Sequence, residues 1–199
     1  MSDVSIRRHP LPVGIIGSHS GGWWGMVGLI LTEAALFVYL LFSYYYFAIQ
    51  PHAAPWPPEM PALKLAAPNT IILLLSSAAV WWGERSTRRG RRSSQLLGLG
   101  IGFLLGIIFI VVQAFEWKSK SFSLTSGPYG SLFFTVTGFH MAHVILGVLI
   151  LAAILLWSAL GYFGPVRSAP VTIGAMYWHF VDAVWLAVFF TFYITPYLG

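Results

Sequence analysis

Five long runs of apolar residues limit the folds that this chain can adopt. A bilayer core about 30 Å thick is crossed by about 20 apolar residues in a helix, and backbone groups in lipid must hydrogen-bond within their own segment or in a closed barrel. Runs of this length therefore predict helices. They cover residues 23–47, 65–83, 95–115, 131–160 and 171–194. The expected fold class is all-α, a polytopic membrane protein with a bundle of five transmembrane helices.

The segments between these runs contain no soluble domain. Only 9% of the residues are charged, whereas soluble domains carry about 25%. Residues 50–68 include six prolines, a density that predicts a surface loop without helix. Residues 126–130 read Ser-Gly-Pro-Tyr-Gly and predict a turn. We expect a cytoplasmic N-terminal segment at residues 1–22 and a five-helix membrane domain at residues 23–199.

Lysine and arginine are divided unevenly between the two sides of such a bundle. One side would hold Arg7, Arg8, Arg85, Arg88, Arg89, Arg91, Arg92 and Arg167. The other side would hold Lys64, Lys118 and Lys120. Since positively charged loops stay in the cytoplasm, we expect a cytoplasmic N-terminus and, after five spans, a periplasmic C-terminus or its topological equivalent. The expected location is the bacterial inner (plasma) membrane.

The chain contains no cysteine, which restricts its redox chemistry. Disulfides, thiolate metal sites, iron–sulfur clusters and the cysteine-bridged dicopper centre of electron-entry subunits are all excluded. Any redox cofactor would need histidine as its ligand. The net charge of +5 is typical of loops that face anionic lipid and does not indicate nucleic-acid binding.

Glu33 is the only charged residue in the first apolar run. It lies about 15 Å from the start of that run, near the middle of the bilayer, where an ionised carboxylate costs about 2.5 to 3.5 kcal/mol. Glu33 must therefore be protonated, paired or turned toward protein. Two interpretations follow: a carboxylate that handles protons, or a neutral acid that hydrogen-bonds a neighbouring helix.

Three histidines and two further acids lie in or at the ends of the later runs. His140 and His143 share one helical face, which could hold a haem or a metal together with His179. Two ligands on one helical turn are too close together to bind a single iron from opposite sides. The pattern therefore favours hydrogen-bonded helix packing. Asp182 can bond to His179 or to a neighbouring helix. Glu116 ends the third run, where an interfacial position is expected.

Four sequence motifs make the chain recognisable. They are QAFEW at residues 113–117, GPYGSLFF at 127–134, TGFHMAHVILG at 137–147 and YWHFVDAVW at 177–185. In this order and spacing they resemble subunit III of haem-copper oxidases, and the resemblance extends from Trp23 to the C-terminus. The chain is similar to the five-helix form, which lacks the two leading helices, so the resemblance does not imply a lipid-filled cleft between such a pair and the rest within this one chain. It also has Trp117 where the family usually has tyrosine.

The resemblance implies an enzyme complex in which this chain is one non-catalytic subunit. The complex is a proton-pumping, oxygen-reducing cytochrome c oxidase, with haem and copper held by the partner subunits I and II. This chain would have no catalytic residue, metal or cofactor of its own, but would bind phospholipid and support proton uptake. By the resemblance, Glu33 is the buried proton-related carboxylate and Arg167 is a partner for lipid phosphate. The positions that hold the bundle together become Glu116, His140, His143, His179 and Asp182.

Three other functions remain compatible with these residues. The same fold could serve a quinol oxidase as subunit III or a nitric oxide reductase as an accessory protein. A haem b membrane anchor would use His140 or His143 together with His179. A proton channel would use Glu33 to line an aqueous path, although one central carboxylate makes this function the weakest of the three.

Overall fold

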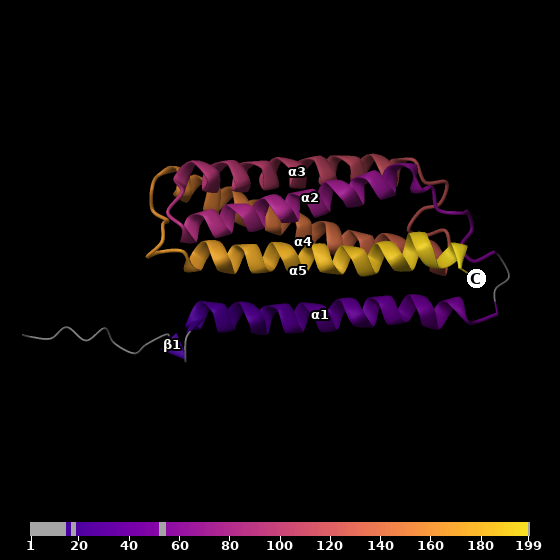
Figure 1. The fold of residues 1–199 in the computed structure, drawn as a ribbon. Helices are drawn as coiled ribbons and strands as arrows, with labels where there is room; N and C mark the ends of the chain where they lie inside the picture. Colours follow the sequence, from indigo (N-terminus) through magenta and orange to yellow (C-terminus); the bar gives the residue numbers. More distant parts are fainter. Residues whose placement is uncertain (1–14, 17–18, 52–54, 199) are drawn as a thin grey trace, which may run out of the picture.

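The structure is a computed structural model that describes residues 15–16, 19–51 and 55–198, and within these residues it is a bundle of five long helices (Figure 1). All five are long and apolar enough to cross a membrane, which confirms the predicted fold class. Most of the predicted N-terminal segment at residues 1–22 lies outside the described residues. The helices are α1 (Gly21–Ala48), α2 (Leu63–Arg88), α3 (Arg92–Lys118), α4 (Pro128–Ala159) and α5 (Ala169–Phe189).

Short elements flank the bundle at both ends of the described chain. Strands β1 (Ile15–Ile16) and β2 (His19–Ser20) form a small antiparallel pair directly before α1. Helix α5 continues into a π turn, η1 (Phe190–Ile194), and then a 3₁₀ turn, η2 (Thr195–Tyr197). The fifth apolar helix therefore extends to the end of the described chain.

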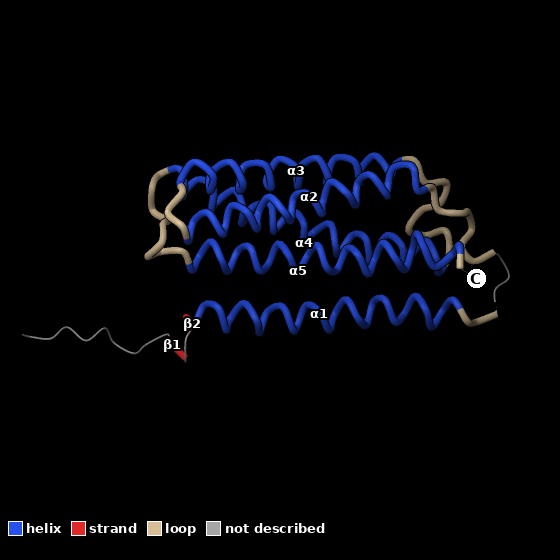
Figure 2. The backbone as a smooth tube through the Cα atoms, in the orientation of Figure 1, coloured by secondary structure: helices blue, strands red, loops and turns tan. Residues whose placement is uncertain are grey.

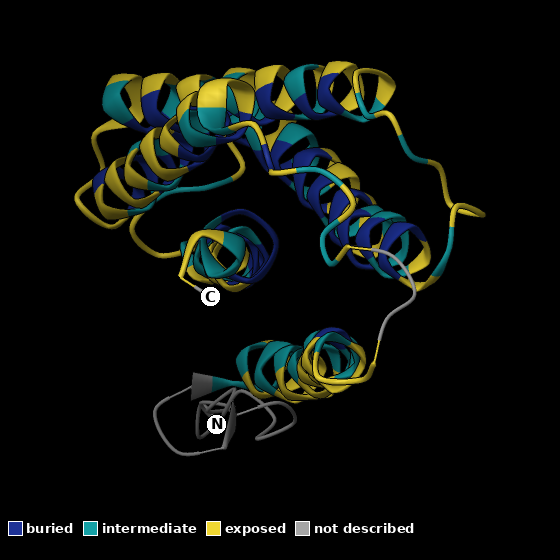
Figure 3. Ribbon diagram, turned by 90° about the vertical axis from the view of Figure 1, so that its right-hand side faces the viewer, coloured by how far each residue is buried: buried dark blue, intermediate teal, exposed yellow. Residues whose placement is uncertain are grey.

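The five helices run side by side, but α1 is less covered than the other four. Helix α5 contacts α1, α2 and α4, whereas α2 packs closely on α3 and α3 on α4. Figures 1 and 2 show α1 along one side of this group, next to α5, and Figure 3 shows that its outer face is exposed. We call α2 to α5 the body of the bundle.

The alternating helices sort the described basic residues into two ends. The end that contains the start of α1, the turn between α2 and α3, and the loop between α4 and α5 is here called the arginine end. The opposite end contains the start of α2, the end of α3 and the C-terminus, and is called the lysine end (Figure 1). This is the separation of charges that the sequence predicts.

Small residues bring α2 and α3 into close contact. A Cβ added at Gly98 would lie 2.7 Å from the Cα atom of Gly83. At Gly102 an added Cβ would lie 2.4 Å from Cγ2 of Val80. Both distances are below any real contact, so glycine is required for this packing.

The predicted loop at residues 50–68 is wrong at its C-terminal end. Helix α2 begins at Leu63 and contains Pro68. A proline at this position removes only one helical hydrogen bond, the one to the Lys64 carbonyl. The buried side chains of Ala66 and Asn69 pack this first part of α2 against the bundle, and neighbouring helices make such prolines tolerable in membrane proteins.

The predicted turn at residues 126–130 is also shorter than expected. Pro128 is the first residue of α4, preceded by Gly127 with a φ of 114°. Proline suits the first helical position because its missing N–H would have no partner there. Glycine readily adopts the positive φ that the chain needs just before the helix.

Candidate functional site

Glu33 meets His143 where α1 packs against α4. The Oε2 atom of Glu33 lies 3.1 Å from Nε2 of His143, and the exposed fractions of the two side chains are 30% and 15%. Both residues lie well inside their helices, at membrane depth. The sequence predicts each residue as important, but it does not predict that they form a pair.

The second nitrogen of His143 fixes the chemistry of this pair. Its Nδ1 atom lies 2.7 Å from the Phe139 carbonyl oxygen, which can only accept a hydrogen bond, so Nδ1 carries a hydrogen. A hydrogen bond to Glu33 then needs one more proton, either on the carboxyl group or on Nε2. The pair thus shares one exchangeable proton, and its two arrangements are neutral acid with neutral imidazole or carboxylate with imidazolium.

Aromatic residues hold the His143 ring in place. The Phe37 ring centroid lies 5.0 Å from that of His143 in an edge-to-face arrangement, and Phe37 is buried. Tyr177 on α5 donates a hydrogen bond of 3.5 Å to the His143 carbonyl. Because the ring has little freedom, the shared proton has a defined position between α1 and α4.

His140 is on the same face of α4 but has a different role. Its Nε2 atom donates to the Val181 carbonyl at 3.2 Å, and the residue is fully buried against Trp185 and Phe109. This hydrogen bond joins α4 to α5. The role of His140 as a packing residue stays a prediction.

His179 and Asp182 on α5 do not hydrogen-bond to each other, which was one of the two options that their spacing left open. Nδ1 of His179 lies 2.6 Å from Oγ of Ser77 on α2. Asp182 is buried, and neither of its oxygens meets a hydrogen-bond partner within normal geometry.

Glu116 lies near the end of α3 and is buried. It accepts a hydrogen bond of 2.6 Å from the Tyr193 hydroxyl and lies 3.1 Å from Nζ of Lys120. The ammonium group also sits over the Phe133 and Tyr193 rings. Lys120 and Tyr193 are not among the predicted site residues, although the four-residue spacing of Glu116 and Lys120 is a recognisable ion-pair signal.

Arg167 is exposed in the loop between α4 and α5, at the arginine end. Its backbone N–H bonds to the Gly164 carbonyl at 3.0 Å. The loop encloses a shallow hollow of about 390 Å³ that Arg167 borders.

The three membrane histidines have separate hydrogen-bond partners, namely Glu33, the Val181 carbonyl and Ser77. Among the described residues no group of three or more potential metal ligands comes together. Each histidine is instead placed for hydrogen bonding between helices.

Comparison with known proteins agrees with the motifs and the fold. The sequence model of the family "Cytochrome c oxidase subunit III" matches residues 15–197. A protein named cytochrome c oxidase subunit 3 from Osphranter robustus is 36% identical over 177 residues, which cover 85% of this chain and 68% of that protein. The protein of that name from Drosophila melanogaster is 35% identical over the same shares, and that from Danio rerio is 34% identical over 182 residues, again 85% and 68% of the two chains. With a match that spans all five helices, the chain belongs to the cytochrome c oxidase subunit III family.

Proposed function

We propose that this chain is the non-catalytic third subunit of a proton-pumping, oxygen-reducing cytochrome c oxidase. The family match supports this assignment, as do the names of its relatives. Haem and copper belong to partner subunits I and II in this proposal, because the chain has no cysteine for a dicopper centre. The role of this subunit is to support the catalytic subunit, its proton uptake and its lipid surroundings.

The observation that carries the proton-related role is the contact between Glu33 and His143. A carboxyl group in a membrane span is costly unless it is neutral or paired, and this pair satisfies the requirement while sharing one proton. The exposed part of Glu33 lies at membrane depth, where we expect the catalytic subunit to cover it and to supply the route for that proton. The pair therefore acts as a proton acceptor beside the catalytic subunit and speeds delivery of protons to it.

The same proposal assigns location and orientation. The chain spans a bacterial inner membrane five times, with its arginine end and N-terminus in the cytoplasm and its C-terminus in the periplasm. The clustered arginines support this orientation through the positive-inside rule. Arg167 then faces the phosphates of the cytoplasmic leaflet and binds phospholipid there.

Purification of the complex through a tag on this chain tests the assignment. Mass spectrometry and an optical spectrum should show haem arriving together with a large, histidine-rich subunit I and a copper-binding subunit II. Turnover with reduced cytochrome c, but not with a quinol, is expected. Haem on the isolated chain, or a quinol-specific partner, would overturn the assignment.

The proton-related role has a separate test in the Glu33→Gln variant of the complex. Glutamine keeps the size and a hydrogen bond to His143 but cannot bind an exchangeable acid proton. We expect an intact complex whose proton uptake during turnover is slower than that of the wild type. An unchanged rate would contradict the role of Glu33, and loss of the complex would show that Glu33 is structural.

A further inference from the structure

The turn between α2 and α3 carries a dense cluster of positive charge. Five of the chain's eleven lysines and arginines lie there within eight residues, namely Arg85, Arg88, Arg89, Arg91 and Arg92. The only acid beside them is Glu84. At the lysine end, by contrast, three lysines share their surface with two acids, Glu59 and Glu116. Orientation in the membrane needs only an excess of positive charge on one side, so the density of charge at this turn calls for a further explanation.

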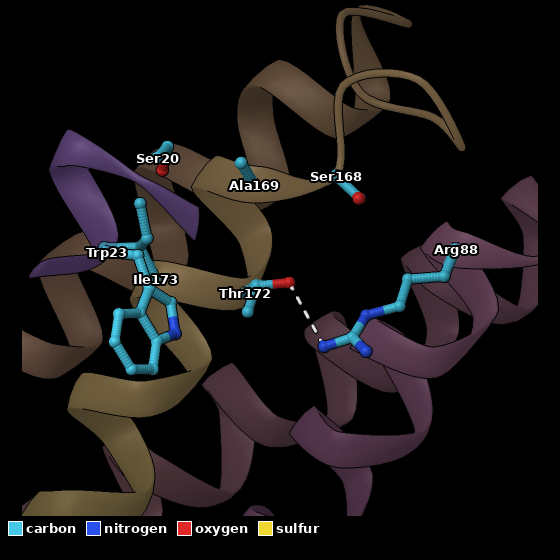
Figure 4. A pocket seen from close by; sticks show the side chains of 7 residues that line it. All are labelled: Ser20, Trp23, Arg88, Ser168, Ala169, Thr172 and Ile173. Atoms are coloured by element: carbon cyan, nitrogen blue, oxygen red, sulfur yellow. Dashed lines mark hydrogen bonds between the residues drawn. The ribbon is translucent and has the colours of Figure 1, made fainter. Parts of the chain in front are cut away.

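Two of these arginines are held by the body of the bundle. Arg88 forms an ion pair with Glu84 and donates a hydrogen bond of 3.4 Å to the Thr172 hydroxyl on α5 (Figure 4). Arg92 donates a hydrogen bond of 2.8 Å to the Ala159 carbonyl at the end of α4. Both guanidinium groups therefore tie the turn to neighbouring helices, and one of them already uses the single acid nearby.

The other three arginines have no anionic partner within the described part of the chain. Arg85, Arg89 and Arg91 are exposed. The Arg85 guanidinium lies over the Trp81 ring, 5.4 Å from its centroid. None of the three side chains forms an ion pair or a hydrogen bond with a described residue. Three positive charges are thus open to an anion from outside the chain.

The backbone of the turn gives these side chains a defined arrangement. The Arg91 N–H donates to the Ser86 carbonyl at 3.0 Å. The Gly90 N–H donates to the Thr87 carbonyl at 3.1 Å, and the two bonds together form the Schellman pattern of a helix end. Gly90 has the positive φ, 70°, that this pattern requires. Since Arg89 and Arg91 stand on either side of this glycine, both side chains start from a fixed part of the backbone.

The surface on the membrane side of the turn suits the rest of a phospholipid molecule. Trp81 and Trp82 are exposed about one helical turn before Arg85, and exposed tryptophan is typical of the level of the lipid headgroups. Farther from the turn, α2 and α3 expose large apolar side chains, namely Ile71, Leu74, Leu75, Leu97, Ile101 and Leu104. An anion with acyl chains therefore meets matching surfaces at both levels, whereas a soluble anion would contact the arginines alone.

We propose that the turn between α2 and α3 is a binding site for anionic phospholipid, with Arg85, Arg89 and Arg91 as the ligands of its phosphate. A guanidinium group forms paired hydrogen bonds to phosphate oxygens, and basic residues at the end of a membrane helix attract anionic lipid. The site is separate from Arg167 in the loop between α4 and α5 and from Glu33 inside the membrane. It does not depend on the functions proposed above for those two residues.

Native mass spectrometry of the purified complex tests this proposal, with phosphatidylglycerol as the anionic probe and phosphatidylcholine as the zwitterionic one. Each basic residue near the membrane surface strengthens the binding of anionic lipid about fivefold. In the triple variant Arg85→Gln, Arg89→Gln and Arg91→Gln we therefore expect phosphatidylglycerol to bind about a hundredfold more weakly, and phosphatidylcholine to bind as before. Lipid held by partner subunits is the same in both complexes, so the difference between them reports this site.

Matched variants separate the possible outcomes. Lys64→Gln with Lys118→Gln is the control, because both lysines are exposed at the lysine end, and this double variant should keep the affinity that the triple variant loses. Inorganic phosphate at the concentration of the lipid should not displace phosphatidylglycerol. If the triple variant fails to assemble, Arg89→Gln and Arg91→Gln are measured singly, and each should weaken binding about fivefold.

Three results would overturn the proposal. The first is equal affinity of the wild type and the arginine variants for phosphatidylglycerol, or an equal loss in the lysine control, which would show that only total charge matters. The second is displacement of the lipid by phosphate, which would identify a site for free anions. The third is an acidic protein bound at the turn of the wild type in place of lipid.

Discussion

Two acidic residues in this bundle are paired with bases in opposite ways. Glu33 meets His143 through one contact, and nearly a third of its side chain is exposed. Glu116 is buried with both Lys120 and Tyr193 as partners. The first pair needs one more proton for its hydrogen bond, whereas the second is an ion pair inside the body of the bundle that also accepts a bond from a hydroxyl. We therefore expect the first acid to serve proton exchange and the second to serve the structure of the bundle.

The largest effect is expected when the pair of Glu116 and Lys120 is broken. Glu116→Ala leaves the ammonium group of Lys120 buried without a counter-charge, and removal of one partner of a buried pair costs about 3 to 5 kcal/mol. Thermal unfolding of the purified complex should show a correspondingly lower midpoint. A variant as stable as the wild type would mean that Lys120 escapes to water and that the pair is not structural.

Neutralising both partners should recover most of that loss. In the double variant Glu116→Gln with Lys120→Met no charge remains buried, and the glutamine oxygen can still accept from Tyr193. Buried ion pairs replaced by uncharged residues of similar volume are often neutral in stability. We expect the unfolding midpoint to return close to that of the wild type. A double variant no better than Glu116→Ala would show that the charges themselves stabilise the fold.

A packing change should separate the body of the bundle from α1. Gly98→Ala introduces a Cβ 2.7 Å from the α2 backbone, and overpacking of this kind costs about 1 to 3 kcal/mol. Gly28→Ala on α1 is the matched control, because nothing lies within 4 Å of its added Cβ. Unfolding should detect the first change and not the second. Equal effects would contradict the difference in packing between the two regions.

The smallest effect on stability is expected at Glu33. Glu33→Gln keeps a hydrogen bond to a partly exposed residue, and net contributions of such bonds are about 0.5 to 1.5 kcal/mol, so the loss should be at the low end of that range. Unfolding of the variant complex measures this directly. A loss as large as that of Glu116→Ala would place Glu33 with the structural acids and remove the contrast between the two pairs.

The sequence predicts the five helices because length and hydropathy decide them locally. It also identifies Glu33, since a lone carboxylate in an apolar run is conspicuous. It does not identify Ser77 or Tyr193, because an uncharged hydroxyl carries no signal until a helix from elsewhere in the chain is placed beside it. Pro68 misled the prediction for the same reason. A proline removes a backbone hydrogen bond, which locally favours a loop. Only the packing of α2 against the bundle shows that the helix can include this proline.

The π turn η1 makes the C-terminal part of the chain sensitive to its exact length. The backbone N–H of Thr195 donates a hydrogen bond to the Phe190 carbonyl five residues earlier, one residue more than an α-helical turn spans. Each residue of an α-helix rotates the chain by about 100°, so deletion of a single residue here would turn every later side chain by that angle. Substitutions within η1 preserve the phase of the helix, whereas insertions and deletions do not.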